Sequence, residues 1–154
     1  MPSTQTIRYT SSVGSVARLD VGSAGKVLLA FMPEEERERS LALLEAGLRD
    51  EDGDPAKLRR TIASVRRQGW ANSLGERVKG AAAISVPVES RPLLLALSVL
   101  GPDTRLDRDA LMAMLPEMRR TAAALAELID RTTDWEDKAD ERDGDGRPPN
   151  RRDT

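Results

Sequence analysis

Three stretches in the first half of the chain show apolar residues at helical spacing. Residues 24–31 form a short apolar run, and Ser23 before it is of a type that caps helix N-termini. A second helix is predicted to begin at Pro33 and to end near Gly47, and a third to run between Asp54 and Gly69. The apolar faces of the second and third helices are predicted to be Leu41, Leu44, Leu48 and Leu58, Ile62, Val65.

Two extended runs follow, at residues 81–88 and 93–100, with a short polar turn between them. They predict an antiparallel hairpin, and their continuous apolar character predicts burial on both faces. A shorter extended segment is expected at residues 7–14. The last helix is expected to be kinked or restarted at Pro116. Its predicted apolar stripe is Leu111, Met114, Leu115, Met118, Ala122, Leu125 and Ile129.

This order of elements predicts an α+β domain over residues 1–129, with helices packed on a mostly antiparallel sheet. Residues 130–154 differ sharply in composition, with nine acidic and six basic side chains and almost no apolar ones. Such a segment cannot bury enough surface to offset the entropy of ordering, so a disordered charged tail is predicted there.

Composition narrows the possible chemistry. The 154 residues include no His and no Cys, which excludes Ser-His and Cys-His catalysis, disulfides and Cys-ligated or His-ligated metals. The 24 basic and 26 acidic residues give a net charge of −2, which disfavours a surface built for nucleic acid. Aromatic residues are too few for base stacking. Binding is therefore favoured over catalysis, and neither a cofactor nor a metal is expected.

The N-terminus lacks the basic and apolar regions of a signal peptide. The longest apolar runs, at residues 27–32 and 92–100, are far shorter than a membrane span. We therefore expect a cytoplasmic chain with no membrane partner.

The segment Gly22–Lys26 is the best candidate for binding chemistry. Small residues allow a ligand to approach the backbone, and free N–H groups at a helix start together with Lys26 favour an anion, such as a small carboxylate. A tight helix entry with an exposed lysine explains the same residues equally well. The arginines of the third predicted helix could bind phosphate, but a solvated face is favoured for them; they are Arg59, Arg60, Arg66 and Arg67.

Two sharper motifs fail. A P-loop requires a glycine where Asp20 stands and a Ser or Thr where Val27 stands. Ser23 and Lys26 match the Ser-x-x-Lys motif of penicillin-binding enzymes, but the other elements of that site are absent. The acidic loop at residues 50–54 lacks the calcium-loop pattern.

Five blocks, in order and at the right spacing, resemble the effector-binding domain of the IclR family of bacterial transcription regulators. They are Ala24-Gly25-Lys26, the Arg66–Trp70 turn, Glu76 to Gly80, Ser85-Val86-Pro87-Val88, and Ala96 to Pro102. The resemblance implies a GAF-like fold with a six-stranded antiparallel sheet flanked by helices. It also implies that the winged helix-turn-helix and the first strands and helix of the effector domain are missing, so that the domain is N-terminally truncated.

The resemblance further implies a small organic-acid effector and assembly as a homodimer or tetramer, with DNA bound only through the absent winged helix. Leucine at position 100 and alanine at 83 make the implied pocket rather apolar. The effector-binding residues it implies are Ser23, Ala24, Gly25, Lys26, Ser73, Glu76, Ala83, Ser85, Ser98 and Leu100.

We therefore expect the effector-sensing domain of an IclR-type regulator, binding a small, partly apolar carboxylate and not an enzyme. Two alternatives remain open. One is a truncated oligomerisation fragment that has lost ligand sensing. The other is a hydrolase that uses Ser23 and Lys26.

Overall fold

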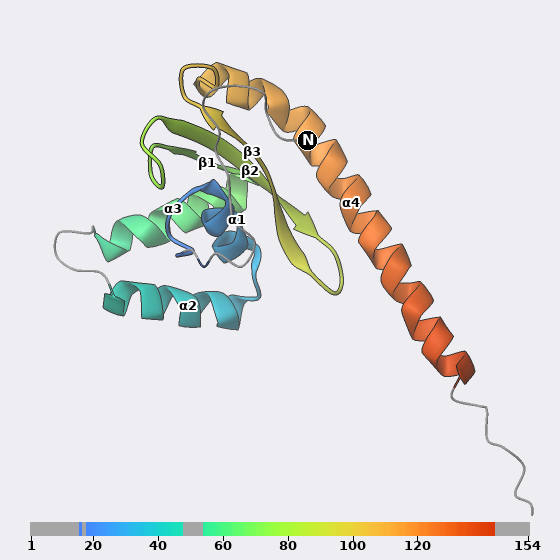
Figure 1. Ribbon diagram of the computed structural model, residues 1–154. Helices are drawn as coiled ribbons and strands as arrows, with labels where there is room; N and C mark the ends of the chain where they lie inside the picture. Colours follow the sequence, from blue (N-terminus) through green and yellow to red (C-terminus); the bar gives the residue numbers. More distant parts are fainter. Residues whose placement is uncertain (1–15, 17, 48–53, 144–154) are drawn as a thin grey trace, which may run out of the picture.

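The computed structural model describes residues 16, 18–47 and 54–143 (Figure 1). The segment expected at residues 7–14 and the acidic loop at 50–53 lie outside this part of the chain. The described elements are α1 (Ser23–Phe31), α2 (Glu34–Gly47), α3 (Pro55–Gln68), β1 (Ala71–Leu74), β2 (Ala81–Glu89), β3 (Leu94–Pro102) and α4 (Arg108–Asp143).

An antiparallel three-stranded sheet in the order β1-β2-β3 forms the centre of the described fold. Helices α1, α2 and α3 lie on one side of it, and α4 runs along the other (Figure 1). The predicted α+β class, antiparallel hairpin and flanking helices are therefore confirmed. Of the six strands implied by the resemblance, three are found in the described residues.

Both faces of β2 are buried, and its polar residues are limited to the buried Ser85 and to Glu89 at its exposed end. Alternate residues from Ala82 to Val88 pack under Leu111, Leu115 and Met118 of α4. On the α1 side, a second core joins α1 to the other helices and to the start of β1; its buried members are Val27, Leu29, Ala30, Leu41, Ile62, Val65 and Ala71. Burial of β2 on both faces is confirmed.

The same expectation is wrong for β3. Leu95 and Leu100 are 41% and 53% exposed, although β3 is as apolar as β2. The reason is position: β3 lies at the edge of the described sheet, and α4 contacts it far less than it contacts β2.

Helix α4 does not end at Ile129, where the domain boundary was predicted, but continues to Asp143. The domain boundary at residue 129 and the disorder of the charged tail stay predictions. Between Pro116 and Gly144 the sequence has no glycine or proline to stop a helix. The helix also continues through Pro116 without restarting, and Leu115 and Met118 on either side of it both pack in the core.

The predicted start and stop of α3 are confirmed. The Asp54 side chain accepts a hydrogen bond from the N–H of Ala56 at 2.9 Å, and Gly69 ends the helix in the left-handed conformation at φ 78°. Ser23, in contrast, is not the cap of α1. Gly22 holds that position, and Ser23 is the first helical residue, with its hydroxyl turned into the protein.

Candidate functional site

A carboxylate lies at the start of α1, and it belongs to the protein itself. Glu76, in the loop between β1 and β2, accepts a hydrogen bond from the N–H of Gly22 at 2.9 Å and pairs with the Lys26 ammonium at 2.5 Å. The Lys26 side chain is only 14% exposed. The helix start thus has the anion-binding chemistry expected of residues 22–26, because backbone N–H, helix dipole and ammonium act on the same carboxylate.

Three hydroxyl groups form a continuous row beneath this helix start. Ser23 Oγ lies 2.7 Å from Ser85 Oγ, which lies 2.7 Å from Ser98 Oγ. Ser23 and Ser85 are buried, whereas Ser98 is exposed, so the row leads from α1 across β2 to the surface of β3. Each hydroxyl in the row can donate or accept.

The register of the sheet places the remaining strand candidates in a neighbouring row. Ser73 is opposite Ala83, which is opposite Leu100. Because alternate residues of a strand share a face, these three lie on the α1 side with Ser85 and Ser98. The sheet floor beside the hydroxyl row is therefore apolar at Ala83 and Leu100.

Gly25 is required by the close approach of α1 to the preceding chain. A Cβ at this position would lie 2.4 Å from the carbonyl oxygen of Leu19. Gly22 adopts a φ of 86°, which favours glycine, and its N–H is thereby directed at Glu76. Both glycines thus position backbone at the helix start.

Asp20 adds a second acidic group just before this helix. Its two oxygens accept hydrogen bonds from Arg18 at 3.0 and 2.7 Å. The Arg18 guanidinium, assisted by the charge of Lys26, lowers the pKa of the Asp20 carboxyl below its usual value.

The structure thus joins five of the predicted site residues in two sets. Ser23, Ser85 and Ser98 are joined by hydrogen bonds, and Lys26 pairs with Glu76. Ser73, Ala83 and Leu100 share the adjacent row, and Gly25 fits the helix against Leu19. Ala24 is half-buried in the first turn of α1.

Sequence reasoning missed a groove of about 520 Å³ on the α4 side of the molecule. Phe31, Val86 and Ala122 contribute apolar lining, and Arg119 and Glu127 contribute charge. None of the predicted site residues lines it. These residues come from α1, β2 and α4, and no single segment carries a motif that could have revealed the groove.

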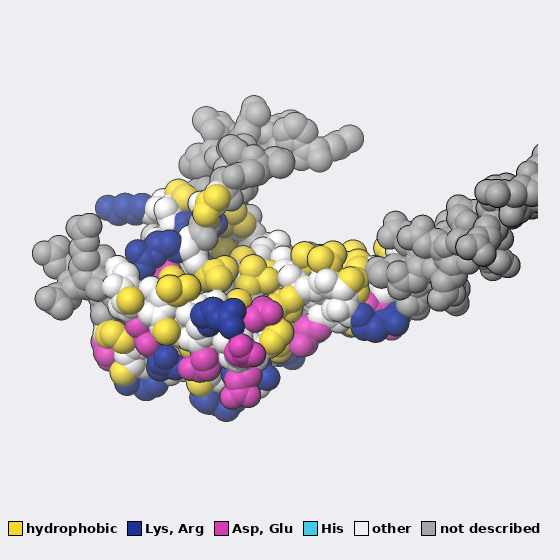
Figure 2. All heavy atoms as spheres, turned by 90° about the horizontal axis from the view of Figure 1, so that it is seen from below, with side chains coloured by type: hydrophobic (Ala, Val, Ile, Leu, Met, Phe, Trp, Pro, Cys, Tyr) yellow, Lys and Arg dark blue, Asp and Glu magenta, His cyan; other side chains and the backbone are white. Residues whose placement is uncertain are grey.

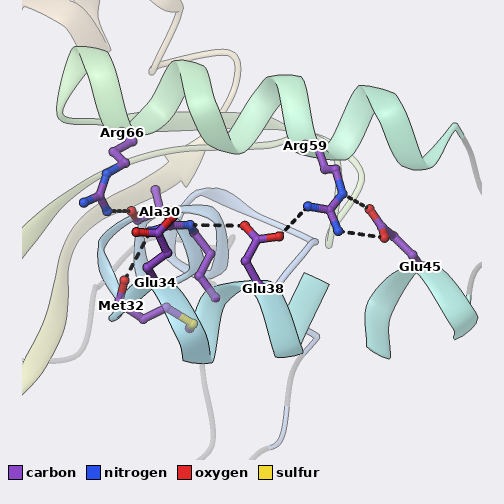
Figure 3. Close-up of polar contacts among 8 residues, drawn as sticks. Ala30, Met32, Glu34, Glu38, Glu45, Arg59 and Arg66 are labelled. Carbon is purple, nitrogen blue, oxygen red and sulfur yellow. Dashed lines mark hydrogen bonds and ion pairs between the residues drawn. The ribbon is translucent and has the colours of Figure 1, made fainter. Parts of the chain in front are cut away.

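Three of the four arginines of α3 make contacts within the fold. Arg59 pairs with Glu38 and Glu45 of α2, and Arg66 donates to the carbonyl oxygen of Ala30 at the end of α1 (Figure 3). The two carboxylates raise the pKa of the Arg59 guanidinium further above its usual value. Arg60 pairs with Asp54. These contacts tie α3 to its neighbours and leave the phosphate-binding alternative without support.

The hydrolase alternative finds no support either. The Ser23 hydroxyl bonds to Ser85 and the Lys26 ammonium to Glu76, so the two side chains are engaged elsewhere. Among the residues that the structure describes, no group of three or more acidic side chains could hold a metal ion. No helix in this part of the chain is long and apolar enough to cross a bilayer.

The described elements form a GAF-like α+β domain with a polar helix start above an antiparallel sheet. Residues 1–127 match the family described as "Bacterial transcriptional regulator IclR C-terminal". The chain belongs to this family, as its motifs predict. Since the family and the curated relatives are transcriptional regulators, the expectation that the chain is not an enzyme is confirmed.

Two curated relatives illustrate the match. The chain is 34% identical over 115 residues to "Probable HTH-type transcriptional regulator ArcR" of Halobacterium salinarum, covering 72% of this chain and 44% of that protein. It is 27% identical over 131 residues to the HTH-type transcriptional regulator KipR of Bacillus subtilis, covering 82% and 52%. The chain thus spans about half the length of these relatives.

Solved structures of IclR-type regulators have the same fold as this chain. An IclR transcriptional regulator from Alicyclobacillus acidocaldarius superposes with a TM-score of 0.67 at 26% identity, covering 82% of this chain and 52% of that one. The inducer-binding domain of a PobR double mutant from Acinetobacter, in complex with 3-hydroxybenzoic acid, gives a TM-score of 0.58 at 26% identity, covering 70% and 66%.

Proposed function

We propose that this chain is the effector-sensing part of an IclR-type transcription regulator and that it binds a small, partly apolar carboxylate at the start of α1. The observation that carries the proposal is the position of the Glu76 carboxylate between the Gly22 N–H and the Lys26 ammonium. These donors suit a carboxylate in charge and geometry. The effector's carboxylate takes the place of the Glu76 side chain.

The effector's carboxylate can replace that of Glu76 because Glu76 lies in a loop and not in either core. Its side chain is 33% exposed, and the residues around it from Gly75 to Lys79 are exposed. Glu76 can therefore leave the helix start without disturbing either core. In this mechanism Glu76 competes with the effector for Lys26.

The rest of the effector lies on the sheet beside the helix start. Ala83 and Leu100 supply apolar contacts, and Ser73 and Ser98 supply hydroxyl groups. A carboxylate with an apolar body and one polar substituent suits this surface. The 3-hydroxybenzoic acid bound to the Acinetobacter domain has this chemistry, which supports the ligand class for the present chain.

For the whole protein, we propose that effector binding alters DNA binding by a winged helix-turn-helix outside this sequence. Such a regulator acts in the cytoplasm, with a homodimer or tetramer as its working form. Its membership of a family of transcriptional regulators supports this proposal.

The test is thermal unfolding in the presence of organic acids, with benzoate, 3-hydroxybenzoate and pyruvate as the first probes. A ligand at 100 times its Kd stabilises the folded state by about 2.7 kcal/mol, which gives a clear shift in Tm. Lys26→Ala is expected to abolish the shift. The matched control is Lys79→Ala, because Lys79 is an exposed lysine of the loop that carries Glu76.

Absence of stabilisation by every acid tested, or equal stabilisation of the wild type and Lys26→Ala, would overturn the proposal. Loss of the shift in Lys79→Ala as well would place the binding chemistry in the loop rather than at the helix start.

A further inference from the structure

Arg77 is a charged side chain at the start of α1 that has no partner within the described fold. Its Cδ and Cγ atoms lie 3.0 and 3.4 Å from the place that a Cβ on Gly22 would occupy. The guanidinium is attached to Cδ, so it begins next to this contact. Within the part of the chain that the structure describes, Arg77 makes no hydrogen bond and no ion pair. Its donors are therefore available to a ligand at the helix start.

Several exposed arginines elsewhere in the fold are paired with a carboxylate, as Arg39 is with Glu35 at 2.9 Å. Figure 2 shows one face of the molecule, on which Lys and Arg side chains lie beside Asp and Glu side chains. Arg77 also has a carboxylate next to it in the sequence, that of Glu76. That carboxylate, however, is bound to Lys26 and to the helix start. Arg77 is thus left unpaired beside an ion pair.

The loop that carries Arg77 is anchored at both ends. Gly75 N–H donates to the Ala81 carbonyl at 2.7 Å, and Asp103 N–H donates to the Gly80 carbonyl at 2.9 Å. None of the residues 76–79 belongs to either core. The side chains of this loop can therefore change rotamer while its ends keep their place, so Glu76 can turn toward solvent and leave Arg77 at the helix start.

The charges at the helix start do not balance even when Glu76 is in place. Lys26, Arg77 and the positive end of the helix dipole face this one carboxylate. The neighbouring charges of Arg18 and Asp20 neutralise each other through two hydrogen bonds. When the effector replaces Glu76, its carboxylate therefore meets two cations.

Gly22 brings the binding groups of this place together. Its N–H donates to the carboxylate that occupies the helix start, and its lack of a side chain leaves room for the Arg77 stem. Any larger residue at this position would push the stem of Arg77 away from the helix start.

We propose that Arg77 is the second cation of the effector site and binds the effector's carboxylate together with Lys26 and the Gly22 N–H. This inference rests on the proposed function and adds a specificity-determining residue to it. A guanidinium can donate two parallel hydrogen bonds to a carboxylate, whereas an ammonium acts as a point charge. Arg77 therefore fixes the orientation of the carboxylate, and Lys26 supplies charge.

Two cations also narrow the class of ligand. A carboxylate offers acceptor oxygens to both Lys26 and Arg77. An amide of the same shape has only one acceptor oxygen and would turn its NH2 group toward one of the two cations, which can only donate. The site is therefore expected to bind an ionised acid and to reject the corresponding amide.

The test is titration calorimetry with whichever of benzoate, 3-hydroxybenzoate and pyruvate most stabilises the wild type. Arg77→Ala is expected to raise the Kd about tenfold, as the loss of a charge-assisted hydrogen bond does. Arg77→Lys should restore only part of the affinity, because it returns the charge without the fork of donors. Lys79→Ala is the matched control, since it removes the same charge from the same loop, and its Kd should stay within about twofold of the wild type. Urea unfolding of ligand-free Arg77→Ala should equal that of the wild type.

Two results contradict the role of Arg77 while the proposed function stands: an unchanged Kd for Arg77→Ala, and an equal rise in Kd for Arg77→Ala and Lys79→Ala. A lower stability of ligand-free Arg77→Ala would assign this residue a structural role instead. If the wild type binds none of the three acids, or if Lys26→Ala binds as tightly as the wild type, the proposed function itself is wrong, and so is this inference.

Discussion

Lys26 and Glu76, 50 residues apart in the sequence, meet at 2.5 Å over the first turn of α1. The lysine comes from the helix and the glutamate from the loop between β1 and β2. This ion pair closes the anion-binding helix start with a group of the protein's own. Any anionic ligand at this place has to compete with that group.

The competition leads to a prediction for Glu76. In Glu76→Gln the side chain keeps its size but loses the charge that attracts Lys26, so a carboxylate effector is expected to bind more tightly, by about tenfold if roughly 1.4 kcal/mol of competition is removed. Titration calorimetry with the best acid from the thermal screen measures the change. Weaker binding by Glu76→Gln would mean that Glu76 contacts the effector instead of yielding to it.

A second prediction concerns the middle of the hydroxyl row. Ser85→Ala leaves the buried Ser23 hydroxyl without its partner, which is expected to cost about 1–3 kcal/mol in the free energy of unfolding. Urea unfolding measures this. Ser98→Ala is the control, because Ser98 is exposed and its loss leaves the buried pair intact. Equal effects of the two changes would contradict the role of the buried pair.

Gly25→Ala should be strongly destabilising. The added methyl group would lie 2.4 Å from the Leu19 carbonyl oxygen, so α1 or the chain before it must move, at a cost of about 1–3 kcal/mol or more. Gly47→Ala is the matched control at the end of α2, where a Cβ meets nothing within 4 Å. That change is expected to be neutral or to stabilise the protein by up to about 1 kcal/mol. Thermal unfolding of the two variants distinguishes the outcomes.

The lowered pKa of Asp20 predicts an acid dependence of stability. Because the pKa of Asp20 in the folded protein lies below its ordinary value of 3.8, the unfolded chain binds the proton more readily. The stabilisation by Asp20 is present above pH 3.8 and is lost as the pH falls through the folded pKa. Unfolding of the wild type and Asp20→Asn between pH 2.5 and pH 6 should show a steeper acid loss for the wild type. Parallel curves would contradict this prediction.

Local signals in the sequence were sufficient for the boundaries of α3 and for the hairpin. The Asp54-Pro55 start, the Gly69 stop and the apolar stripe of α4 are each encoded within a few residues. Strand β1 was missed because Ala-Asn-Ser-Leu shows no clear alternation and pairs only by its proximity to β2. The exposure of β3 was missed because hydrophobicity does not reveal whether another element covers a strand.

The sequence indicated which residues form the candidate site, but it did not indicate which of them bond to one another. The Gly22–Lys26 pattern indicated an anion at a helix start, and the resemblance indicated Glu76, Ser85 and Ser98. That the anion is the side chain of Glu76, and that Ser23 bonds to Ser85 rather than capping α1, depends on contacts between distant segments. Spacing along one segment carries no information about such contacts.

The row from Ser98 to Ser23 has a further consequence, because a hydroxyl that donates its one proton must accept from its other neighbour. A group that accepts a hydrogen bond from Ser98 requires Ser98 to receive one from Ser85, and Ser85 to receive one from Ser23. If the group instead donates to Ser98, the row can also run the other way, with Ser98 donating to Ser85 and Ser85 to Ser23. The polarity of a contact at the sheet surface thus sets the orientation of a buried dipole beneath α1, and it does so without displacing any heavy atom.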